Sequence, residues 1–546
     1  MANLSQIKRE KMLRFLETLK EQHSDDESLI ALNQIEKELT SKKYGLVWEE
    51  HEEEVDVKMQ THIPVFTEDE GREIVGNPES EDYNFLLEGD NLHSLKLLEK
   101  THKGKIDVIY IDPPYNTGNK DFVYDDLKIG DDDGYRHSKW ISFMKSRLVV
   151  AKRVLKEHGI IFISIDDNEV AQLKMLSSEI FGENNYVGTI VWKKKTNGNN
   201  MGWLPPVHDY ILCYAKNIEQ IYDIGLEVGE EEIAKRYSNP DDDPRGPWTT
   251  SDLSANHVGP SFVIHNPKTG QIFYPPEGRY WVFNEKEVNK RIEDGRIIFG
   301  KSGTARPVQK VFAKDRIIGK RKVESWWDDC ALNSDATKEL KSIFGIAKVF
   351  THPKPSKLIK RLLEMSCDKN AIVLDFFAGS GTTAQAVLEL NQEDGGDRHF
   401  ILCTNNDSDI CSNVTYPRIK TVITGKRIDG TEYSEGIPAN LKYYRTDFVA
   451  KDSEDLYEDL LNHIVEMIQL EYGVKVDNKK YVIIMDDDEM DAFEENFEKY
   501  SDLKAVFLNQ DVLLSTSQEQ LLAEVNTFII PDCYFDFELR EDGELW

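Results

Sequence analysis

Short, almost continuous runs of apolar residues alternate along much of this chain with longer segments in which apolar residues recur every three or four positions. The short runs are typical of strands buried on both faces of a parallel sheet, and the longer segments are typical of amphipathic helices. The runs that we interpret as strands are 85–87, 106–111, 160–165, 189–192, 371–374 and 400–403. The helices expected between them include 139–156 and 356–367. This alternation predicts an α/β fold with a doubly wound, mainly parallel sheet.

Two further helices are expected before the sheet begins. Their apolar residues recur at helical spacing: Met12, Phe15, Leu16 and Leu19 in the first, and Leu29, Leu32, Ile35 and Leu39 in the second. The polar residues 24–26 between them are suited to ending one helix and capping the next. Two interpretations stay open for this hairpin, a dimerisation or docking element and a hairpin packed on its own core.

The pattern changes at two places, which suggests domain boundaries. From about residue 196 to 349, Gly, Pro, Trp and Tyr accumulate and short segments replace the βα units, as expected for an insertion. The chain after residue 450 contains its own helix and two strands, 481–485 and 527–530. We therefore divide the chain into an N-terminal helical region (1–80), a first half of the sheet domain (81–195), an insertion (196–350), a second half of the sheet domain (351–450) and an acidic C-terminal domain (451–546).

Length and composition are those of a globular protein with several domains. A chain of 546 residues is too long for one hydrophobic core. It has no apolar run of about 18 residues or more, and its N-terminus lacks the apolar core of a signal peptide, so we expect no membrane association. The cysteines form no CxxC pair, which predicts neither a disulfide framework nor a zinc site and suits a reducing cytoplasm. They are Cys213, Cys330, Cys367, Cys403, Cys411 and Cys533.

The net charge of -32 argues at first against nucleic acid as a partner. The acidity, however, belongs to the two ends: residues 451–546 carry 26 acidic and 7 basic residues, and residues 1–80 carry 19 and 10. The middle is close to neutral, and its segment 301–322 carries eight basic residues against one acid, Asp315, with tryptophans nearby. Such a cluster is either a solvated face or a surface for phosphate contacts, and we favour the phosphate contacts because of the motifs described next.

The segment 375–383, Asp-Phe-Phe-Ala-Gly-Ser-Gly-Thr-Thr, begins where the predicted strand 371–374 ends. Gly379 and Gly381 would let the backbone approach a ligand closely, and the helix that follows would offer free N–H groups. No lysine follows the second glycine, so this is not a phosphate-binding P-loop. By itself the segment is either a ligand-binding loop or a tight turn that serves packing alone.

A second motif, Asp112-Pro113-Pro114-Tyr115, follows the predicted strand 106–111. Two prolines fix φ and remove two N–H donors, so the loop presents carbonyl acceptors and one carboxylate. These groups suit an amino group that brings two N–H donors, and Tyr115 offers a face on which a base can stack. A proline-stiffened turn is the alternative. With both loops at strand ends of one domain, a cofactor pocket beside a pocket for a flat, polar-edged group is favoured.

The two motifs together resemble the signatures of amino-directed DNA methyltransferases that use S-adenosylmethionine. Their order is similar to that of the permuted β class, and the chain resembles in particular the modification (Mod) subunits of Type III restriction–modification systems. The resemblance covers most of the chain and includes residues 88–91, 110–119, 136–140, 163–168, 371–383 and 438–441. It implies a Rossmann-like methyltransferase sheet with circularly permuted motif order, and a target-recognition domain in the 196–350 insertion.

The resemblance also implies roles for individual residues. Asp112, Pro113, Pro114 and Tyr115 would hold and stack the flipped base, with Asp112 or the Pro113 carbonyl accepting from its amino group. The implied cofactor contacts are Asp90, Asn91, Lys354, Phe377, Gly379, Gly381, Thr382, Thr383, Thr404 and Asn405. Lys354 lies in 352–356, which resembles the motif that closes the cofactor pocket. The expected ribose-binding acid after strand 400–403 is absent or displaced to Asp407. No metal is required. The DNA contacts that we expect are Lys193, Lys194, Lys195, Lys320, Arg321 and Lys322.

We therefore predict an enzyme that methylates N6 of adenine in double-stranded DNA after rotating the base out of the stack. Cytosine N4 presents the same kind of amino group and stays open as a target, although Asp rather than Ser before Pro-Pro-Tyr favours adenine by resemblance. An RNA or protein amide methyltransferase, and a DNA-binding module without catalysis, are further alternatives. The expected partners are a second copy of the chain and a helicase–nuclease restriction subunit, with the acidic C-terminal domain as a docking candidate.

Overall fold

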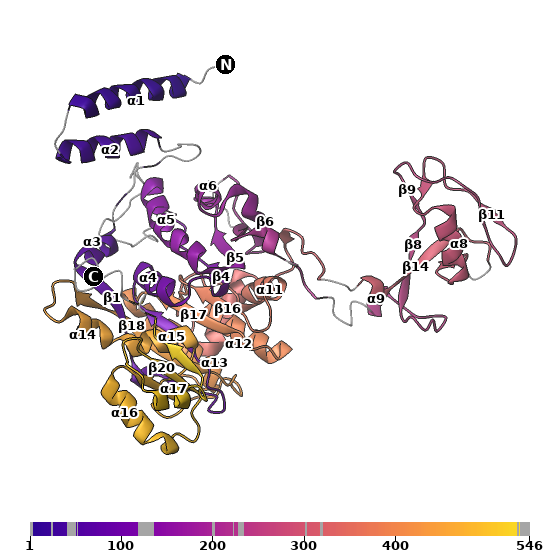
Figure 1. Cartoon of the computed structure of the whole chain (residues 1–546). Helices are drawn as coiled ribbons and strands as arrows, with labels where there is room; N and C mark the ends of the chain where they lie inside the picture. The colour runs from indigo at the N-terminus through magenta and orange to yellow at the C-terminus, as the bar shows by residue number, and fades with distance from the viewer. Residues whose placement is uncertain are drawn as a thin grey trace.

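Figure 1 shows the computed structural model of the chain, which describes residues 4–22, 26–40, 48, 51, 53–117, 136–198, 203–221, 223–227, 234–300, 303–316, 320–531 and 534. Gly118, Asn119, Lys301 and Cys533, which were considered above, lie outside the described residues, and so does the side chain of Leu39.

A large sheet forms the centre of the fold. Its strands, in chain order, are β1 (His62–Glu68), β2 (Ile74–Val75), β3 (Asn84–Glu88), β4 (Ile106–Ile111), β5 (Leu155–Ile165), β6 (Tyr186–Lys193), β7 (His208–Ala215), β15 (Trp326–Trp327), β16 (Ile372–Asp375), β17 (His399–Thr404) and β18 (Asn440–Ala450). They lie in the order β1-β18-β3-β17-β16-β4-β5-β7-β6-β15, with β2 beside β18. The strands from β18 to β5 are parallel, and β1 and β7 are antiparallel to their neighbours. The mainly parallel α/β fold expected from the sequence is thus confirmed.

Helices cover both faces of the sheet (Figure 1). One face packs against α4 (Asn91–Thr101), α5 (Arg136–Val154) and α6 (Val170–Phe181), and the other against α10 (Asn333–Phe344), α11 (Ser356–Ser366), α12 (Thr382–Asp394) and α13 (Tyr416–Thr424). Residues of β4 alternate between the two cores: Ile109 and Ile111 lie in the first, and Val108 and Tyr110 in the second. Burial on both faces explains why these strands are almost continuously apolar.

The strand expected at 160–165 begins earlier than its apolar pattern predicted. β5 starts at Leu155, directly after α5, because Leu155 pairs with Ile106 before the register shifts and Ile160 pairs with Val108. A second difference concerns β7, which lies inside the expected insertion yet belongs to the large sheet, between β5 and β6. The segment after residue 196 therefore first adds β7 to the sheet, then leaves it, and returns to it at β15.

A small unit with its own core follows. It contains β8 (Trp248–Asp252), β9 (Ser254–Ala255), β10 (Ile264–His265), β11 (Ile272–Phe273), β12 (Tyr280–Trp281), α8 (Glu285–Glu293), β13 (Ile297–Ile298), β14 (Val308–Phe312) and α9 (Ala313–Arg316). Leu253, Ile264, Trp281, Val288 and Ile297 are buried together in it. Figure 1 shows this unit apart from the large sheet. We call it the 234–316 unit.

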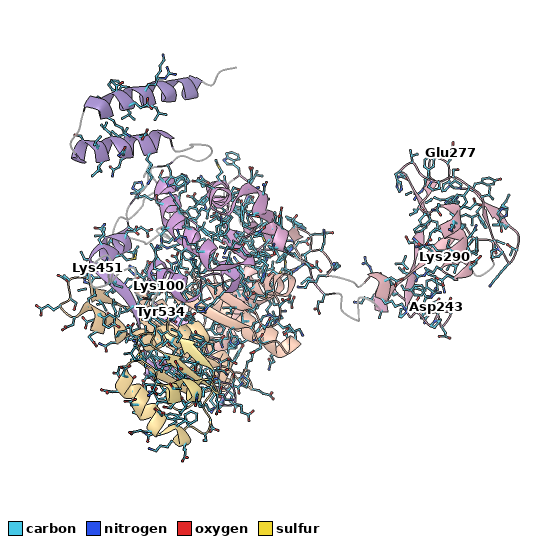
Figure 2. All side chains as sticks on the ribbon, in the orientation of Figure 1. Lys100, Asp243, Glu277, Lys290, Lys451 and Tyr534 are labelled. Carbon is cyan, nitrogen blue, oxygen red and sulfur yellow. The ribbon has the colours of Figure 1, made fainter. Side chains whose placement is uncertain are left out.

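The acidic C-terminal segment packs on the sheet domain. Two helices, α14 (Leu456–Leu461) and α15 (Ile464–Tyr472), contribute side chains to the same core as α4 and α5. A three-stranded parallel sheet follows, with β19 (Tyr481–Ile484), β20 (Ala505–Leu508) and β21 (Thr527–Ile529), next to α16 (Asp487–Glu495) and α17 (Thr516–Leu522). Figure 2 shows Lys100 and Tyr534 beside each other, where Lys100 Nζ donates to the Tyr534 carbonyl at 2.6 Å. The segment therefore supports the sheet domain, whatever else it contacts.

The N-terminal helices form the expected hairpin, α1 (Leu4–Gln22) and α2 (Asp26–Thr40), and α3 (Glu54–Thr61) leads into β1. Leu16 and Leu32 are buried, whereas Phe15 is 63% exposed and Ile30 60% exposed. The hairpin thus buries part of its apolar surface and leaves part of it open. Within the described residues, none of the helices has the length and apolar character needed to cross a membrane.

Candidate functional site

The motif loops lie at one edge of the large sheet. Because β3, β17, β16 and β4 are neighbouring parallel strands, their carboxyl ends meet at this edge. Asp90 follows β3, Asn405 follows β17, the glycine-rich loop follows β16, and Asp112 follows β4. The two principal motifs are far apart in the chain but adjacent in space, since Leu374 pairs with Ile109.

A buried ammonium group holds Asp112. Lys354 Nζ donates to both carboxylate oxygens of Asp112 at 2.6 Å and to the Tyr115 hydroxyl at 2.9 Å. The Lys354 side chain is only 9% exposed, so this charge-assisted contact is shielded from water. Burial and the Asp112 carboxylate raise the pKa of Tyr115, which keeps its phenol neutral. Lys354 was expected to contact the cofactor, and in the structure it donates to the Asp-Pro-Pro-Tyr motif.

A second carboxylate, Asp209 at the start of β7, lies close to this pair. It is buried and accepts from Lys194 Nζ at 2.5 Å. Burial raises the pKa of Asp209, while the charges of Lys354 and Lys194 oppose the rise. Asp209 was not predicted because its strand was assigned to the insertion. The same contact shows that Lys194, expected to bind DNA, is engaged by a buried acid.

The Asp-Pro-Pro-Tyr loop is held rigidly from behind. Trp140 in α5 donates its indole N–H to the Pro114 carbonyl at 2.7 Å. Asn116, in the left-handed region with φ 55°, donates to Glu169 Oε1 at 2.6 Å, and His137 Nδ1 lies 2.6 Å from the same oxygen. A residue other than glycine adopts this φ only where its surroundings hold it there. The loop therefore presents a preformed surface.

The glycine-rich loop turns sharply between β16 and α12. Gly379 has φ 48° and Gly381 has φ 75°, both in the left-handed region that favours glycine. A Cβ on Gly381 would lie 3.2 Å from Thr415 Cγ2, and Thr415 Oγ1 donates to the Gly379 carbonyl at 2.6 Å. Both glycines are thus required by conformation, and the second also by a close approach to Thr415.

The two threonines of the motif fix the loop from inside the protein. Thr383 Oγ1 donates to Asp375 Oδ2 at 2.5 Å, and Thr382 Oγ1 accepts from Arg418 Nη1 at 2.7 Å. Arg418 is completely buried, and burial lowers its pKa to about 10. Arg418 was not predicted, because nothing in its local sequence distinguishes it from a surface arginine of a helix.

Asp375 is a buried carboxyl group with a pKa raised to about 7, chiefly by burial, although Thr383 and the Phe377 N–H donate to it. A pKa raised above the ordinary value of 3.8 stabilises the fold below pH ~4, and this contribution is lost as pH rises through ~7. We expect Asp375→Asn to remove a slope of up to about 1.4 kcal/mol per pH unit from the unfolding free energy over this range. Denaturant unfolding of the wild type and the variant at several pH values measures this slope. The same slope in both proteins would contradict the prediction.

The end of β3 is tied to both neighbouring elements. Asp90 caps α4 by accepting from the Leu92 N–H at 2.7 Å, and Asn91 donates to the Phe376 carbonyl at 2.8 Å. Arg147 in α5 is completely buried and donates to Asn91 at 2.5 Å and to Glu53 at 2.8 and 3.0 Å. Glu53 and Arg147 were not predicted, since their partners come from distant parts of the chain.

Asp407, the candidate for the displaced acid, lies shortly after the end of β17. Asp407 accepts from Asn405 Nδ2 at 2.5 Å. Its pKa is raised by partial burial and by the carboxylate of Asp90 at the neighbouring strand end. Two carboxylates at the ends of neighbouring strands, beside a glycine-rich loop, suit a ligand with hydroxyl or amino donors or with positive charge. The buried Thr404 precedes them at the end of the strand.

The model of one protein family, described as DNA methylase, matches residues 106–415. This chain belongs to the DNA methylase family. It is 39% identical over 350 residues to the Type III restriction-modification enzyme StyLTI Mod subunit of Salmonella typhimurium, in a match covering 59% of this chain and 52% of that one. It is 33% identical to the EcoP15I Mod subunit of Escherichia coli (70% and 68% covered) and to the Type II methyltransferase M.KpnI of Klebsiella pneumoniae (66% and 90% covered). The chain spans about half the length of the StyLTI Mod subunit.

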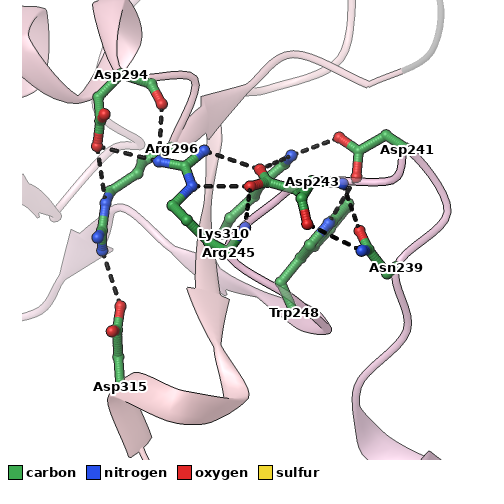
Figure 3. Close-up of polar contacts among 9 residues, drawn as sticks. All are labelled: Asn239, Asp241, Asp243, Arg245, Trp248, Asp294, Arg296, Lys310 and Asp315. Atoms are coloured by element: carbon green, nitrogen blue, oxygen red, sulfur yellow. Dashed lines mark hydrogen bonds and ion pairs between the residues drawn. The ribbon is translucent and has the colours of Figure 1, made fainter.

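The basic residues of this chain fall into two classes. Lys310, within the expected basic cluster, has a side chain that is 4% exposed and is held by Asp241 and Asp243, as Figure 3 shows. Arg245 and Arg296 join the same network through Asp243, Asp294 and Asp315. These charges stabilise the 234–316 unit. By contrast, Arg321 and Lys322 are exposed, Lys320 is half-buried, and Arg321 pairs through its backbone with Leu226. Lys193 and Lys195 are half-buried at the end of β6.

Proposed function

We propose that this chain is a DNA methyltransferase that moves a methyl group from S-adenosylmethionine to the exocyclic N6 amino group of adenine in duplex DNA. The contact of Lys354 with Asp112 and Tyr115 carries the proposal. The Lys354 ammonium nitrogen, which carries several N–H donors, lies 2.6 Å from the carboxylate oxygens of Asp112 and 2.9 Å from the hydroxyl oxygen of Tyr115. An exocyclic amino group presents two such donors. In the resting chain, Lys354 therefore occupies the place that the target amino group would take.

Residues at the ends of β3, β17 and β16 fit the cofactor. Asp90 and Asp407 offer carboxylate acceptors for hydroxyl and amino groups, and Asp407 fills the role left open by residues 404–406. The loop that includes Phe377, Gly379 and Gly381 offers backbone that can approach closely. Bound there, S-adenosylmethionine supplies a methyl group activated by a sulfonium centre. Thr382 and Thr383 contribute by holding this loop in shape.

The work of the chain is then mainly to position the amino group. Asp112 accepts from it, Tyr115 stacks on the base, and Trp140 keeps the loop in place. Alignment of this kind contributes up to about 7–11 kcal/mol to lowering a barrier. Lys354 moves off Asp112 when the base enters. Asp209 is close enough for the lysine charge to oppose the rise of its pKa, so the displaced ammonium keeps a carboxylate near it.

The 234–316 unit is suited to target recognition, because it folds around its own core and lies apart from the large sheet. In the sequence it stands between the two halves of the sheet domain. The basic residues outside its internal ion network would contact phosphates, which fixes the register of the protein on DNA, while other side chains read base edges. The exposed residues Arg321 and Lys322, which follow this unit in the chain, are the strongest candidates for phosphate contacts.

Reversing the charge of Lys320, Arg321 and Lys322 to glutamate is therefore expected to weaken DNA binding for all sequences. The slope of log affinity against log salt should fall by about one for each phosphate that is no longer neutralised. Fluorescence anisotropy at several salt concentrations measures this. Reversal of Lys479 and Lys504, which are exposed on the acidic C-terminal domain, is the matched control and should change little. Equal effects of the two variants would contradict the assignment.

We further propose that the chain is the modification subunit of a Type III-like system, a proposal supported by its similarity to Mod subunits of such systems. A homodimer is favoured by the apolar side chains left exposed on α1 and α2, among them Phe15 and Ile30. A helicase–nuclease restriction subunit would be the second partner. Methylation and restriction both require access to cellular DNA. We therefore expect the protein in the cytoplasm.

Methyl transfer from labelled S-adenosylmethionine to duplex DNA, followed by single-molecule sequencing of DNA from cells that express the chain, tests the proposal. We expect 6-methyladenine at one short recurring sequence. Methylation of cytosine N4 would overturn the adenine assignment, and cofactor binding without transfer to any DNA would overturn the enzymatic role.

A further inference from the structure

A hairpin tip beside the catalytic pocket exposes two large apolar side chains. Trp203 is 102% exposed and Leu204 is 91% exposed, the highest values among the large apolar residues of the described chain. Both lie between β6 and β7, the antiparallel pair in which Lys193 is opposite His208. Full exposure of an adjacent tryptophan and leucine leaves apolar surface in water, which is explained if another molecule covers it.

The base of this hairpin is rigid. The Lys194 N–H donates to the Val207 carbonyl at 2.9 Å, so pairing continues beyond the last register of the strands. Farther out, a Cβ on Gly198 would lie 2.6 Å from Pro205 Cβ, which shows that the two limbs are in contact. Pro205 and Pro206 directly follow Leu204 and restrict its limb. Trp203 and Leu204 are thus carried at the end of a stiff support.

The hairpin also grows out of the wall of the catalytic pocket. The foot of the hairpin contains the ion pair of Lys194 with Asp209 at 2.5 Å. The charges of Lys354 and Asp112 both act on the pKa of Asp209, the first lowering it and the second raising it. Lys193 and Lys195 stand at the same foot and are half-buried. The hairpin thus has an apolar tip, lysines at its foot, and a pocket for a single nucleobase beside it. This combination matches a DNA duplex in both charge and chemistry.

Resting on the proposed function, we propose that Trp203 and Leu204 are the wedge that enters the base stack of the DNA when the target base is rotated out. Apolar side chains inserted between base steps replace the stacking that the flipped base gave up and keep the duplex open. Extrusion of a base costs free energy that is smallest where the base is unpaired. The wedge should therefore matter for a paired target and matter little for an unpaired one.

The test compares the wild type, Trp203→Ala/Leu204→Ala, and the control Leu513→Ala, which truncates a leucine that is 81% exposed on the C-terminal domain. Two synthetic duplexes carry the sequence that the wild type methylates. In one the target base is paired, and in the other it lies opposite an abasic position. Single-turnover methyl transfer is measured on both, together with the fluorescence of 2-aminopurine placed at the target position.

We expect the double variant to lose at least about tenfold in rate on the paired duplex, with less 2-aminopurine fluorescence, and to recover to within about threefold of the wild type on the duplex with the abasic position. The control should match the wild type on both. Equal losses on the two duplexes, or no loss on either, would overturn the wedge. So would an unchanged paired rate with an altered oligomeric state in light scattering, which would make the tip an interface between copies. A wild-type chain that methylates neither duplex would instead overturn the proposed function.

Discussion

Replacing Asp112 by asparagine is expected to lower methyl transfer by about 10²–10³-fold while leaving S-adenosylmethionine binding intact, the range seen when one preorganised polar contact to a transition state is removed. Asparagine keeps the shape of the side chain but loses its charge and one acceptor oxygen. The amino group of the base would then meet one acceptor in place of two, and Lys354 would lose the carboxylate that it holds at 2.6 Å.

Asp107 provides a matched control for this substitution. It lies at the opposite end of the same strand and also holds a lysine, with Lys156 Nζ at 2.8 and 2.9 Å from its two oxygens. Asp107→Asn should affect stability alone. The measurements are initial rates with labelled cofactor and calorimetric cofactor affinity for both variants. Transfer near the wild-type rate in Asp112→Asn would refute the role of Asp112.

The second large effect is expected for Gly381→Asp, which should weaken S-adenosylmethionine binding by more than about tenfold. Gly381 has φ 75°, and residues with side chains lose roughly 1–2 kcal/mol in this region. Its Cβ would lie 3.2 Å from Thr415 Cγ2 and 3.4 Å from the Thr415 carbonyl, so the loop or α13 has to shift.

Gly395→Asp is the control that separates the effect of crowding in the cofactor loop from the cost of a side chain in the left-handed backbone region. Gly395 ends the same helix with a similar φ of 67°, and a Cβ there would meet nothing within 4 Å. This control should therefore carry the backbone cost and the charge without altering the cofactor loop. Isothermal calorimetry on both variants, with circular dichroism to confirm that they are folded, makes the comparison. Equal cofactor affinities would place the cofactor elsewhere.

Local patterns allowed the strands that carry the two motifs to be predicted. The segments around Ile109 and Val373 are continuous apolar runs because both of their faces are buried, and the motif loops follow directly. By comparison, β7 was missed because it lies after a change in composition and pairs with β5 far back in the chain. With it, the contribution of Asp209 to the pocket was missed.

Side chains at the strand ends could be located from the sequence where a motif includes them, and not where only a tertiary contact brings them there. Asp112, Tyr115 and Gly381 stand in recognisable strings, so their position at a strand end could be expected. Arg147 and Arg418 have no such string, yet each is fully buried and ties together segments from different parts of the chain. Lys354 stands in a segment that the resemblance singled out as a cofactor contact, but its contact with Asp112 depends on how α11 packs beside β4.

The sequence by itself determined the class of fold and the two loops, because the periodicity of apolar residues and the stereochemistry of glycine and proline act over a few neighbouring positions. Only the tertiary structure decided which charges meet. Strand order put β17 between β3 and β16, which brought Asp407 toward Asp90, and it brought Lys354 onto Asp112. The tertiary structure also buried Lys310 among acids, although the charged residues of its stretch of sequence are mostly basic. Such pairings arise from contacts between distant segments, which no local pattern encodes.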